Sequence, residues 1–179
     1  MRVGPNFVLQ AFIVLWGFAT IGEGLFVKFT NLECESFNKS VVKFEKCRLK
    51  AVARHNVSLN IHIKFFVNPI HDIKLHAQLL HKGNGFRPLL YNDTLDFCQF
   101  MKNPKRWMFW KLIFDAFSPY TNMNHTCPVN HDVIVKDLSL TTDMMQLLPF
   151  PPNTYLLRFR FFNAIYRGFQ TSVQLTVYN

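Results

Sequence analysis

The feature of this sequence that most constrains its fold is an alternation of apolar and polar residues with a period of two. In residues 57–67 every second position is apolar: Val57, Leu59, Ile61, Ile63, Phe65 and Val67. Successive side chains of a strand point to opposite faces of a sheet, whereas the apolar face of a helix repeats every 3.6 residues. The segment is therefore predicted to be a strand with one buried face.

Seven further segments extend this pattern. The alternation is clear in residues 72–79, 155–162 and 169–178, whose inward positions include Leu75, Phe159, Phe161 and Val173. It is weaker near residues 26–34, 41–53, 87–97 and 132–140. Asn68-Pro69 marks a turn between the strand at 57–67 and the next one. Short strands with one apolar face each predict an all-β fold, an antiparallel β-sandwich.

One segment follows a helical spacing instead. Asn103-Pro104 resembles a helix N-cap followed by proline at the first helical position. After it, aromatic residues recur three or four positions apart, at Trp107, Trp110, Phe114 and Phe117. We expect one short apolar helix over residues 104–117. It either caps one open end of a packed core or forms a lid over a hydrophobic cavity.

The N-terminus is typical of a secretory signal peptide. Arg2 precedes the apolar run FVLQAFIVLWGFATI at residues 7–21, and small residues follow at Gly22 and Gly24. The run is shorter than the roughly 20 residues of a membrane-spanning helix, although a signal anchor is the competing interpretation. We expect residues 1–24 to be removed, with cleavage near 22–24. Residues 25–179 then form a single secreted, extracellular domain with no transmembrane segment.

Two features agree with secretion. Asn-x-Ser/Thr sequons make Asn38, Asn56, Asn92 and Asn124 candidate glycosylation sites in a glycoprotein. Four cysteines, an even number, suggest two disulfides, for which three connectivities exist. We favour the pairs Cys34–Cys47 and Cys98–Cys127 because each closes a local loop. The spacings match no common zinc module.

No pattern points to catalysis or to a cofactor. The sequence has neither a Gly-x-Ser-x-Gly motif nor a glycine-rich phosphate loop, and its 11 acidic residues are scattered. His71, His76 and His81 are evenly spaced, but a spacing of five alternates between the faces of a strand. We therefore expect no enzyme, no metal site and no cofactor.

The net charge of +9 raises the question of a polyanionic partner. The basic residues are spread over several strands, which together with secretion argues against nucleic acid. The densest group, Lys102, Lys105 and Arg106, directly precedes the apolar helix. It suits an anionic lipid head group or membrane surface, although a generic solvated basic face explains it as well.

Four blocks of the sequence together carry a resemblance to known proteins: FTNLECESF (29–37), CRLKAVAR (47–54), FRPLLYNDTLDFCQFMKNPKR (86–106) and NHTCPVNHDVIV (124–135). In these blocks the chain resembles a large insect family of secreted proteins with no assigned function. The family in turn resembles, more distantly, the ML lipid-recognition domains, which include ganglioside-activator and sterol-transfer proteins. That link rests on Cys127-Pro128 before a strand and on the proline-rich step at residues 148–152. Some insect relatives are implicated in chemosensation and pheromone response.

The resemblance implies an immunoglobulin-like, ML-like sandwich that holds a lipid between its two sheets. The sequence departs from the ML pattern in having two expected disulfides instead of three or four. It also lacks a cysteine in the final strand, at residues 169–178.

Two functions follow as hypotheses. The first is a secreted binding protein for a hydrophobic ligand such as a fatty acid, sterol or hydrocarbon. The expected cavity residues are Ile61, Ile63, Phe65, Leu75, Phe159, Phe161 and Val173 in the strands, closed by Trp107, Trp110 and Phe114. The alternative is an extracellular interaction protein with a solid core, which modulates a cell-surface receptor or channel without a bound lipid.

Overall fold

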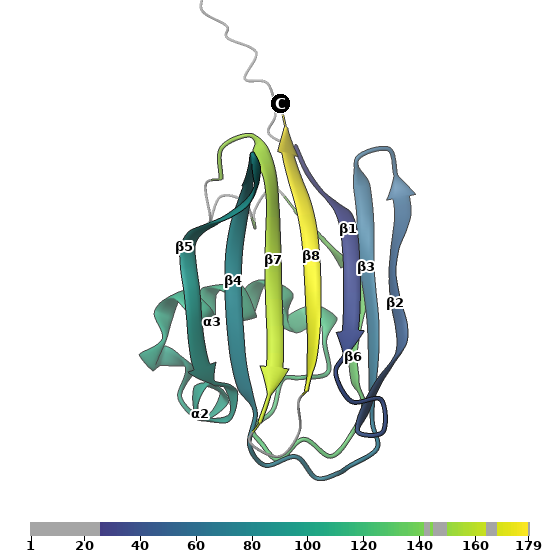
Figure 1. Cartoon of the computed structure of the whole chain (residues 1–179), viewed down its shortest axis with the longest axis vertical. Helices are drawn as coiled ribbons and strands as arrows, with labels where there is room; N and C mark the ends of the chain where they lie inside the picture. Colours follow the sequence, from purple (N-terminus) through teal and green to yellow (C-terminus); the bar gives the residue numbers. More distant parts are fainter. Residues whose placement is uncertain (1–25, 142–143, 145–149, 164–167, 179) are drawn as a thin grey trace, which may run out of the picture.

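The alternating segments form eight strands in two antiparallel sheets (Figure 1). The computed structural model describes residues 26–141, 144, 150–163 and 168–178, so the predicted signal peptide at 1–24 lies outside the described residues. The strands are β1 (Phe26–Ser36), β2 (Val42–Ala53), β3 (Asn56–Phe65), β4 (Lys74–Gly83), β5 (Gly85–Asp96), β6 (Val133–Ser139), β7 (Asn153–Phe162) and β8 (Phe169–Tyr178). One sheet has the order β1-β8-β7-β4-β5 and the other β2-β3-β6. The predicted all-β sandwich is confirmed.

The strand register explains why the alternation buries one face of each sheet. In the five-stranded sheet Leu75 of β4 pairs with Phe161 of β7, which pairs in turn with Phe169 of β8. Residues paired directly across an antiparallel ladder point to the same side of the sheet. Their neighbours in sequence, such as His76 and Arg160, therefore share the opposite face. The apolar positions of successive strands thus form one continuous inner surface.

The two sheets contact each other through aromatic side chains at one end of the sandwich. The ring of Phe169 in β8 lies 5.7 Å from that of Phe44 in β2 and 6.0 Å from that of Phe65 in β3, measured between centroids. Phe161 stacks on Phe169 at 4.9 Å. The connection that carries Asn68-Pro69 passes from the three-stranded sheet to the five-stranded sheet, because β3 and β4 belong to different sheets. Phe169 therefore brings the five-stranded sheet into contact with β2 and β3 at this end.

The helical segment differs from the single helix expected over 104–117. We call residues 97–120 the helical insertion. It contains α2 (Phe97–Lys102), the 3-10 helix η1 (Pro104–Arg106), α3 (Met108–Phe117) and the 3-10 helix η2 (Ser118–Tyr120). The helix breaks at Trp107, whose φ of −121° and ψ of 71° are not helical. Asn103 does precede η1, with Pro104 in its first turn, but its side chain makes no capping hydrogen bond.

The helix α2 was not expected from the sequence. Asp96 at the end of β5 is its N-cap, and the carboxylate accepts a hydrogen bond from the backbone N–H of Gln99 at 2.9 Å. This is the geometry through which aspartate begins a helix. The apolar residues Phe97 and Phe100 are both buried, and their spacing of three suits one face of a helix. The expected strand at 87–97 therefore gives way to a helix at its last residue.

A buried tyrosine fixes the start of β7. Tyr155 is 2% exposed, and its hydroxyl donates to the carbonyl oxygen of Pro151 at 2.8 Å. A tyrosine hydroxyl that bonds to the backbone a few residues upstream is also found at strand corners of immunoglobulin-type sandwiches. Burial raises the pKa of the Tyr155 hydroxyl above its ordinary value of 10.0, since the charged phenolate loses its hydration in the core.

Replacing Tyr155 tests this account through its pH dependence. Tyr155→Phe should lower the free energy of unfolding at neutral pH by about 1 kcal/mol, because it removes a hydrogen bond. The pKa of Tyr155 is higher in the folded state than in the unfolded state, so the wild-type protein loses stability as the pH rises above 10.0. The variant lacks this group. The stability gap between the two proteins, measured by urea unfolding, should therefore narrow above that pH; a gap that stays constant or widens contradicts the account.

Candidate functional site

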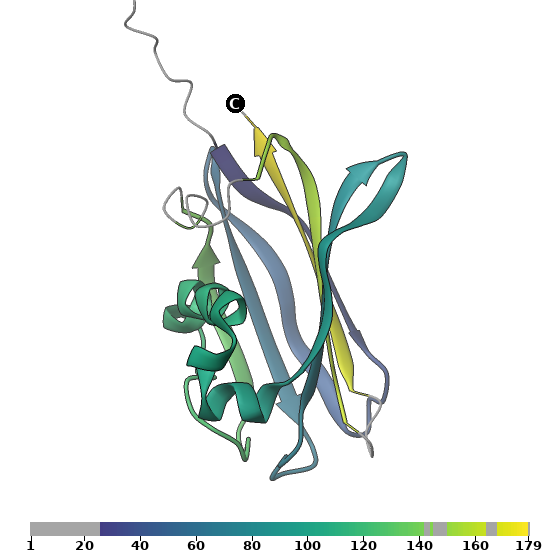
Figure 2. The same cartoon turned by 90° about the vertical axis from the view of Figure 1, so that its left-hand side faces the viewer.

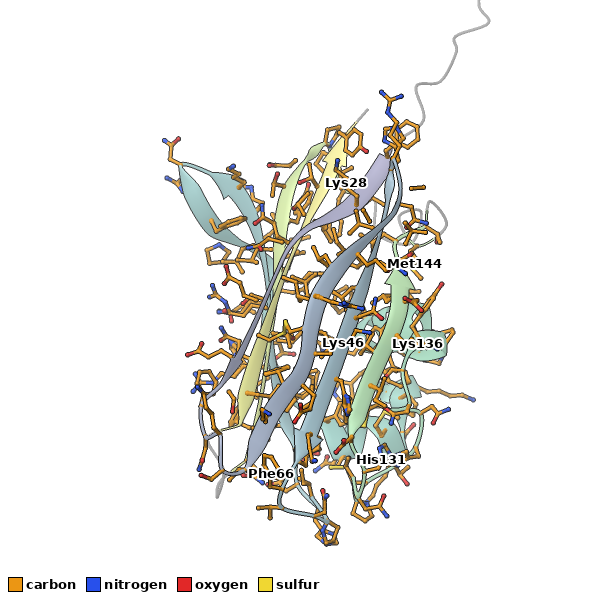
Figure 3. All side chains as sticks on the ribbon, turned by 90° about the vertical axis from the view of Figure 1, so that its right-hand side faces the viewer. Lys28, Lys46, Phe66, His131, Lys136 and Met144 are labelled. Atoms are coloured by element: carbon orange, nitrogen blue, oxygen red, sulfur yellow. A yellow bond between two sulfur atoms is a disulfide. The ribbon has the colours of Figure 1, made fainter. Side chains whose placement is uncertain are left out.

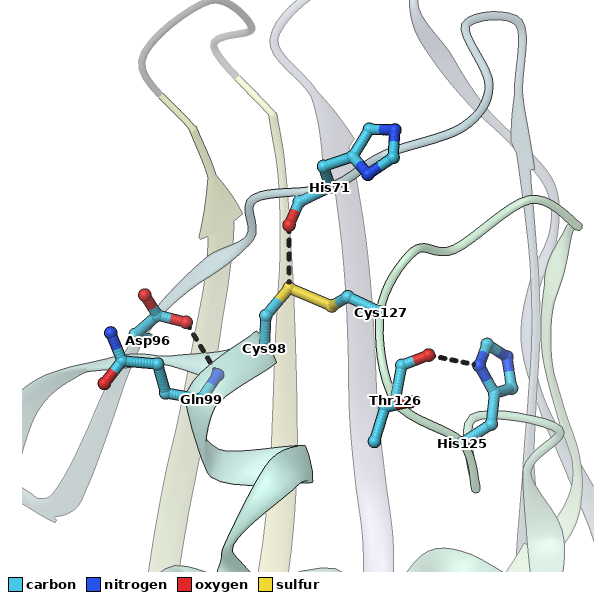
Figure 4. The surroundings of a disulfide bond; sticks show 7 residues. All are labelled: His71, Asp96, Cys98, Gln99, His125, Thr126 and Cys127. Atoms are coloured by element: carbon cyan, nitrogen blue, oxygen red, sulfur yellow. Dashed lines mark hydrogen bonds between the residues drawn. A yellow bond between two sulfur atoms is a disulfide. The ribbon is translucent and has the colours of Figure 1, made fainter.

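The two long edges of the sandwich are closed in different ways. At one edge β1 and β2, which belong to different sheets, are joined by the disulfide Cys34–Cys47. At the other edge the helical insertion lies between the β4–β5 side and β6 (Figure 2). The disulfide Cys98–Cys127 ties α2 to the loop that leads into β6 (Figure 4). These are the two cysteine pairs favoured from the sequence. The sheets are thus joined along one edge and separated by helices along the other.

A cavity of about 320 Å³ lies between the sheets. Side chains from all eight strands line it, together with side chains from α2 and α3. Protein interiors are normally close-packed, with few voids larger than a water molecule. The volume instead falls within the range of about 300–1,000 Å³ that is typical of small-molecule sites. This cavity is the candidate functional site.

The structure brings together nine of the ten residues that the sequence predicted for a cavity. They are Ile61, Ile63, Phe65, Leu75, Trp110, Phe114, Phe159, Phe161 and Val173. The seven strand residues point inward because each lies on the apolar face of its strand. Trp110 and Phe114 belong to α3, which covers the open edge of the sandwich.

The tenth residue, Trp107, does not line the cavity, so the prediction is wrong at this position. Trp107 lies at the break before α3, where its ring packs edge-on against Phe100 at 6.3 Å and lies below the Arg106 guanidinium at 5.4 Å. Its spacing of three from Trp110 would place both on one face of a continuous helix. The break at Trp107 removes that relation.

α3 presents an apolar face to the cavity. Trp110, Ile113, Phe114 and Phe117 all line it, at the spacing of one helix face. Two ring contacts fix the helix in place. Phe109 stacks on Tyr91 of β5 with ring centroids 3.6 Å apart, and Phe114 packs edge-on against Phe100 at 5.7 Å. By contrast Met108, at the start of α3, is 73% exposed. α3 is therefore a wall of the cavity and not only a cap on a packed core.

The sequence analysis missed a second group of lining residues. Phe97 and Phe100 come from α2, Leu138 and Leu140 from the end of β6 and beyond, and Phe150 from the segment before β7. The spacing of Phe97 and Phe100 was the available signal, but both residues also continue the apolar character of the preceding strand. The others lie near strand ends, where alternation is too short to indicate a face.

The cavity wall is almost wholly apolar. Of the lining residues, all within the described part of the chain, only Asp72, Thr121, Asn163 and Thr171 carry a polar group besides the Trp110 indole, and none is lysine, arginine or histidine. Asp72 is exposed, and it borders the cavity where the chain enters β4. Such a wall binds by shape and burial of apolar surface. Among the residues that the structure describes, this wall offers no cation to a buried anionic group.

The remaining predicted features lie on the surface. The sequon residues Asn38, Asn56, Asn92 and Asn124 are all exposed, as attachment of a glycan requires. Within the described ranges the structure has no helix that is long and apolar enough to cross a membrane. The same residues contain no group of three or more His, Cys, Asp or Glu side chains placed to hold a metal ion.

Comparison with known proteins gives a family match over part of the chain. Residues 75–157 match the family described as a protein of unknown function, DUF1091. This stretch runs from β4 to β7 and includes the helical insertion and the disulfide Cys98–Cys127. Among curated proteins none matches this chain. The match fits an uncharacterised family, and the more distant ML resemblance stays a prediction.

The cavity makes a testable prediction about two valines of the same strand. Val173 and Val177 both lie in β8 and are 6% and 2% exposed, but only Val173 lines the cavity. Val173→Phe should change the free energy of unfolding by less than about 1 kcal/mol, because the added ring enters empty space. Val177→Phe should lower it by about 1–3 kcal/mol, the usual effect of overpacking a filled core. Equal losses in denaturant unfolding would show that the sheets are packed at both positions.

Proposed function

We propose that this protein is a secreted binding protein that carries a neutral hydrophobic ligand between its two sheets. The observation that carries the proposal is the apolar cavity of about 320 Å³. An engineered cavity of about 150 Å³ with similar walls holds a benzene molecule. The present cavity is about twice as large, so its volume suits a longer chain or a compact ring system.

The energetic effect of leaving the cavity empty supports a resident ligand. Empty volume in a core costs about 24 cal/mol per Å³ in large-to-small substitutions. Because this cavity is only partly enclosed, the relation gives the direction of the effect and not its size. Water is a poor filler for apolar walls, since it finds no hydrogen-bond partners there. A hydrophobic ligand removes this penalty and at the same time buries its own apolar surface.

The wall chemistry indicates which hydrophobic ligands fit. A buried carboxylate needs a cation or several hydrogen-bond donors, and no lysine, arginine or histidine lines the described cavity wall. The carboxylate of Asp72 at its border disfavours a second negative charge nearby. A sterol, a hydrocarbon or a long-chain alcohol satisfies these conditions better than an ionised fatty acid.

The other candidate, an extracellular interaction protein without a lipid, requires only a solid core and an exposed patch. The cavity is the observation that favours the carrier over it. The predicted signal peptide, the sequons and the two disulfides support secretion, because disulfides persist in oxidising compartments. A role in chemosensation, which the insect resemblance implies, belongs to this proposal as one setting in which such a carrier would act.

A displacement assay tests the ligand class. The probe is an apolar dye that fluoresces on burial, displaced by hexadecan-1-ol or by hexadecanoate, which share a chain length and differ in head group. We expect the alcohol to displace the dye at a concentration at least about tenfold lower, equivalent to about 1.4 kcal/mol. Val173→Phe should weaken dye binding more than Val177→Phe does, because its ring takes up part of the cavity. If neither the wild-type protein nor the Val177→Phe variant binds the dye, the cavity is refuted as a ligand site. A preference for hexadecanoate would refute only the proposal that the ligand is neutral.

A kinetic assay tests α3 as the lid. Trp110→Ala and Phe114→Ala should each speed dye release several-fold, because each removes a side chain that closes the cavity. Trp107→Ala is the matched control, since Trp107 is an aromatic residue of the same insertion that does not line the cavity. Stopped-flow dilution into lipid vesicles measures the release rates. An equal acceleration by all three variants would mean that the insertion is loosened as a whole and that α3 has no specific gating role.

A further inference from the structure

Two histidines face each other in the loop between the helical insertion and β6. The Nε2 atoms of His125 and His131 are 2.6 Å apart, and the ring planes meet at 66° with centroids separated by 4.8 Å. Figure 3 shows His131 at the lower end of β6, at the opposite end of that strand from Met144. Both rings are partly exposed. A metal ion would therefore have access to them from solvent.

The backbone between the two histidines is firmly anchored. Cys127 is bonded to Cys98 of α2, and Val129 forms a reciprocal pair of backbone hydrogen bonds with Ile70, at 2.8 and 2.9 Å. Figure 4 shows His125 beside this disulfide, with its ring turned back toward the Thr126 carbonyl. The fold, and not the contact between the two rings, thus fixes the backbone positions of the two histidines.

The hydrogen bond made by Nδ1 of each ring determines which ring nitrogen carries the hydrogen. Nδ1 of His125 lies 2.7 Å from the carbonyl oxygen of Thr126, and Nδ1 of His131 lies 2.7 Å from that of Asp132. A carbonyl oxygen can only accept, so both Nδ1 atoms must donate. A neutral imidazole carries a single N–H, which leaves each Nε2 with a lone pair. Two lone pairs at 2.6 Å repel each other unless a cation lies between them.

The contact with Asn122 does not favour the other neutral tautomer of His131. Its Nδ2 lies 3.2 Å from Nδ1 of His131, but it donates to the Asp132 carbonyl at the shorter distance of 2.7 Å. Its Oδ1 accepts the backbone N–H of Ile134 at 2.8 Å, which fixes the orientation of the amide. Accepting from Asn122 would place the Nδ1 lone pair of His131 against the Asp132 carbonyl oxygen. The geometry therefore favours Nδ1–H on both rings.

We propose that His125 and His131 bind a divalent transition-metal ion, Zn²⁺ or Cu²⁺, through their Nε2 atoms. Neutral imidazole is a preferred ligand of both ions. Metal-binding histidines characteristically donate the other ring N–H to a carbonyl or carboxylate, which fixes the tautomer and the ring direction. Both histidines have this arrangement already. Tetrahedral coordination at about 2.0–2.1 Å places two nitrogens about 3.3 Å apart, so the partly exposed rings need only separate slightly; water completes the coordination.

The carboxylate of Asp132, the residue next to His131, is engaged elsewhere. Oδ2 of Asp132 lies 2.8 Å from Nε2 of His62 on β3. The site therefore has two protein ligands and open positions. Since Met123 and Val129 of the same loop line the cavity, the ion would also hold one border of the cavity in place, together with the disulfide at Cys127.

Titration with ZnCl₂ or CuCl₂ alone tests this proposal. The protein is the full secreted chain without a histidine tag, and its variants are His125→Gln and His131→Gln. His71→Gln is the matched control, because His71 is exposed and lies on the opposite side of the same disulfide (Figure 4). We expect saturable binding of one ion per chain and a rise in Tm for the wild type and the control. Each of the other two variants should weaken binding at least about tenfold, or 1.4 kcal/mol.

A second readout keeps the test valid for variants that fold poorly. In wild-type protein, ¹⁵N NMR of the histidine rings should show that Zn²⁺ shifts the Nε2 resonances of both His125 and His131, while their Nδ1 atoms keep their hydrogens. Absence of saturable binding, binding that survives both substitutions, or resonances that respond to acid but not to Zn²⁺ would each overturn the proposal. The last result would show that the pair shares only a proton.

Discussion

The structure depends on the separation of its two sheets, which are joined at one edge and held apart at the other. The disulfide Cys34–Cys47 links the edge strands β1 and β2, and Phe169 contacts Phe44 and Phe65 across the interior. At the far edge α3 occupies the space between the sheets and is fixed through the stack of Phe109 on Tyr91. A cavity lined by both sheets and by α3 remains between them.

In this arrangement some apolar residues pack in the core and others line the cavity. Val177 and Tyr155 are almost fully buried and lie outside the cavity wall, so they contribute to stability through packing. Val173, a short distance along the same strand, lines the cavity. The helical insertion has the same division, since Trp107 packs against Phe100 and Trp110 lines the cavity. The proposed carrier function rests on the lining residues alone.

The sequence predicted the strands well and the spaces between them poorly. The alternation around Ile61 or Val173 indicates which side chains face inward, because a strand has only two faces. It does not indicate how far apart two inward faces lie, so alternation alone could not distinguish a cavity from a packed core. α2 was missed because Phe97 and Phe100 continue the apolar pattern of β5. Trp107 was misplaced because its spacing fits a helix that the backbone interrupts. The contact of His125 with His131 depends on the path of a loop, which no periodic pattern describes.

The measurement that tests the central claim most directly is native mass spectrometry of the glycosylated protein secreted from insect cells, followed by organic extraction. The account predicts a mass in excess of the glycosylated chain that disappears on extraction, together with a neutral lipid or hydrocarbon in the extract in equimolar amount. A ligand-free mass, combined with failure of the emptied protein to take up any sterol, hydrocarbon or long-chain alcohol, would contradict it.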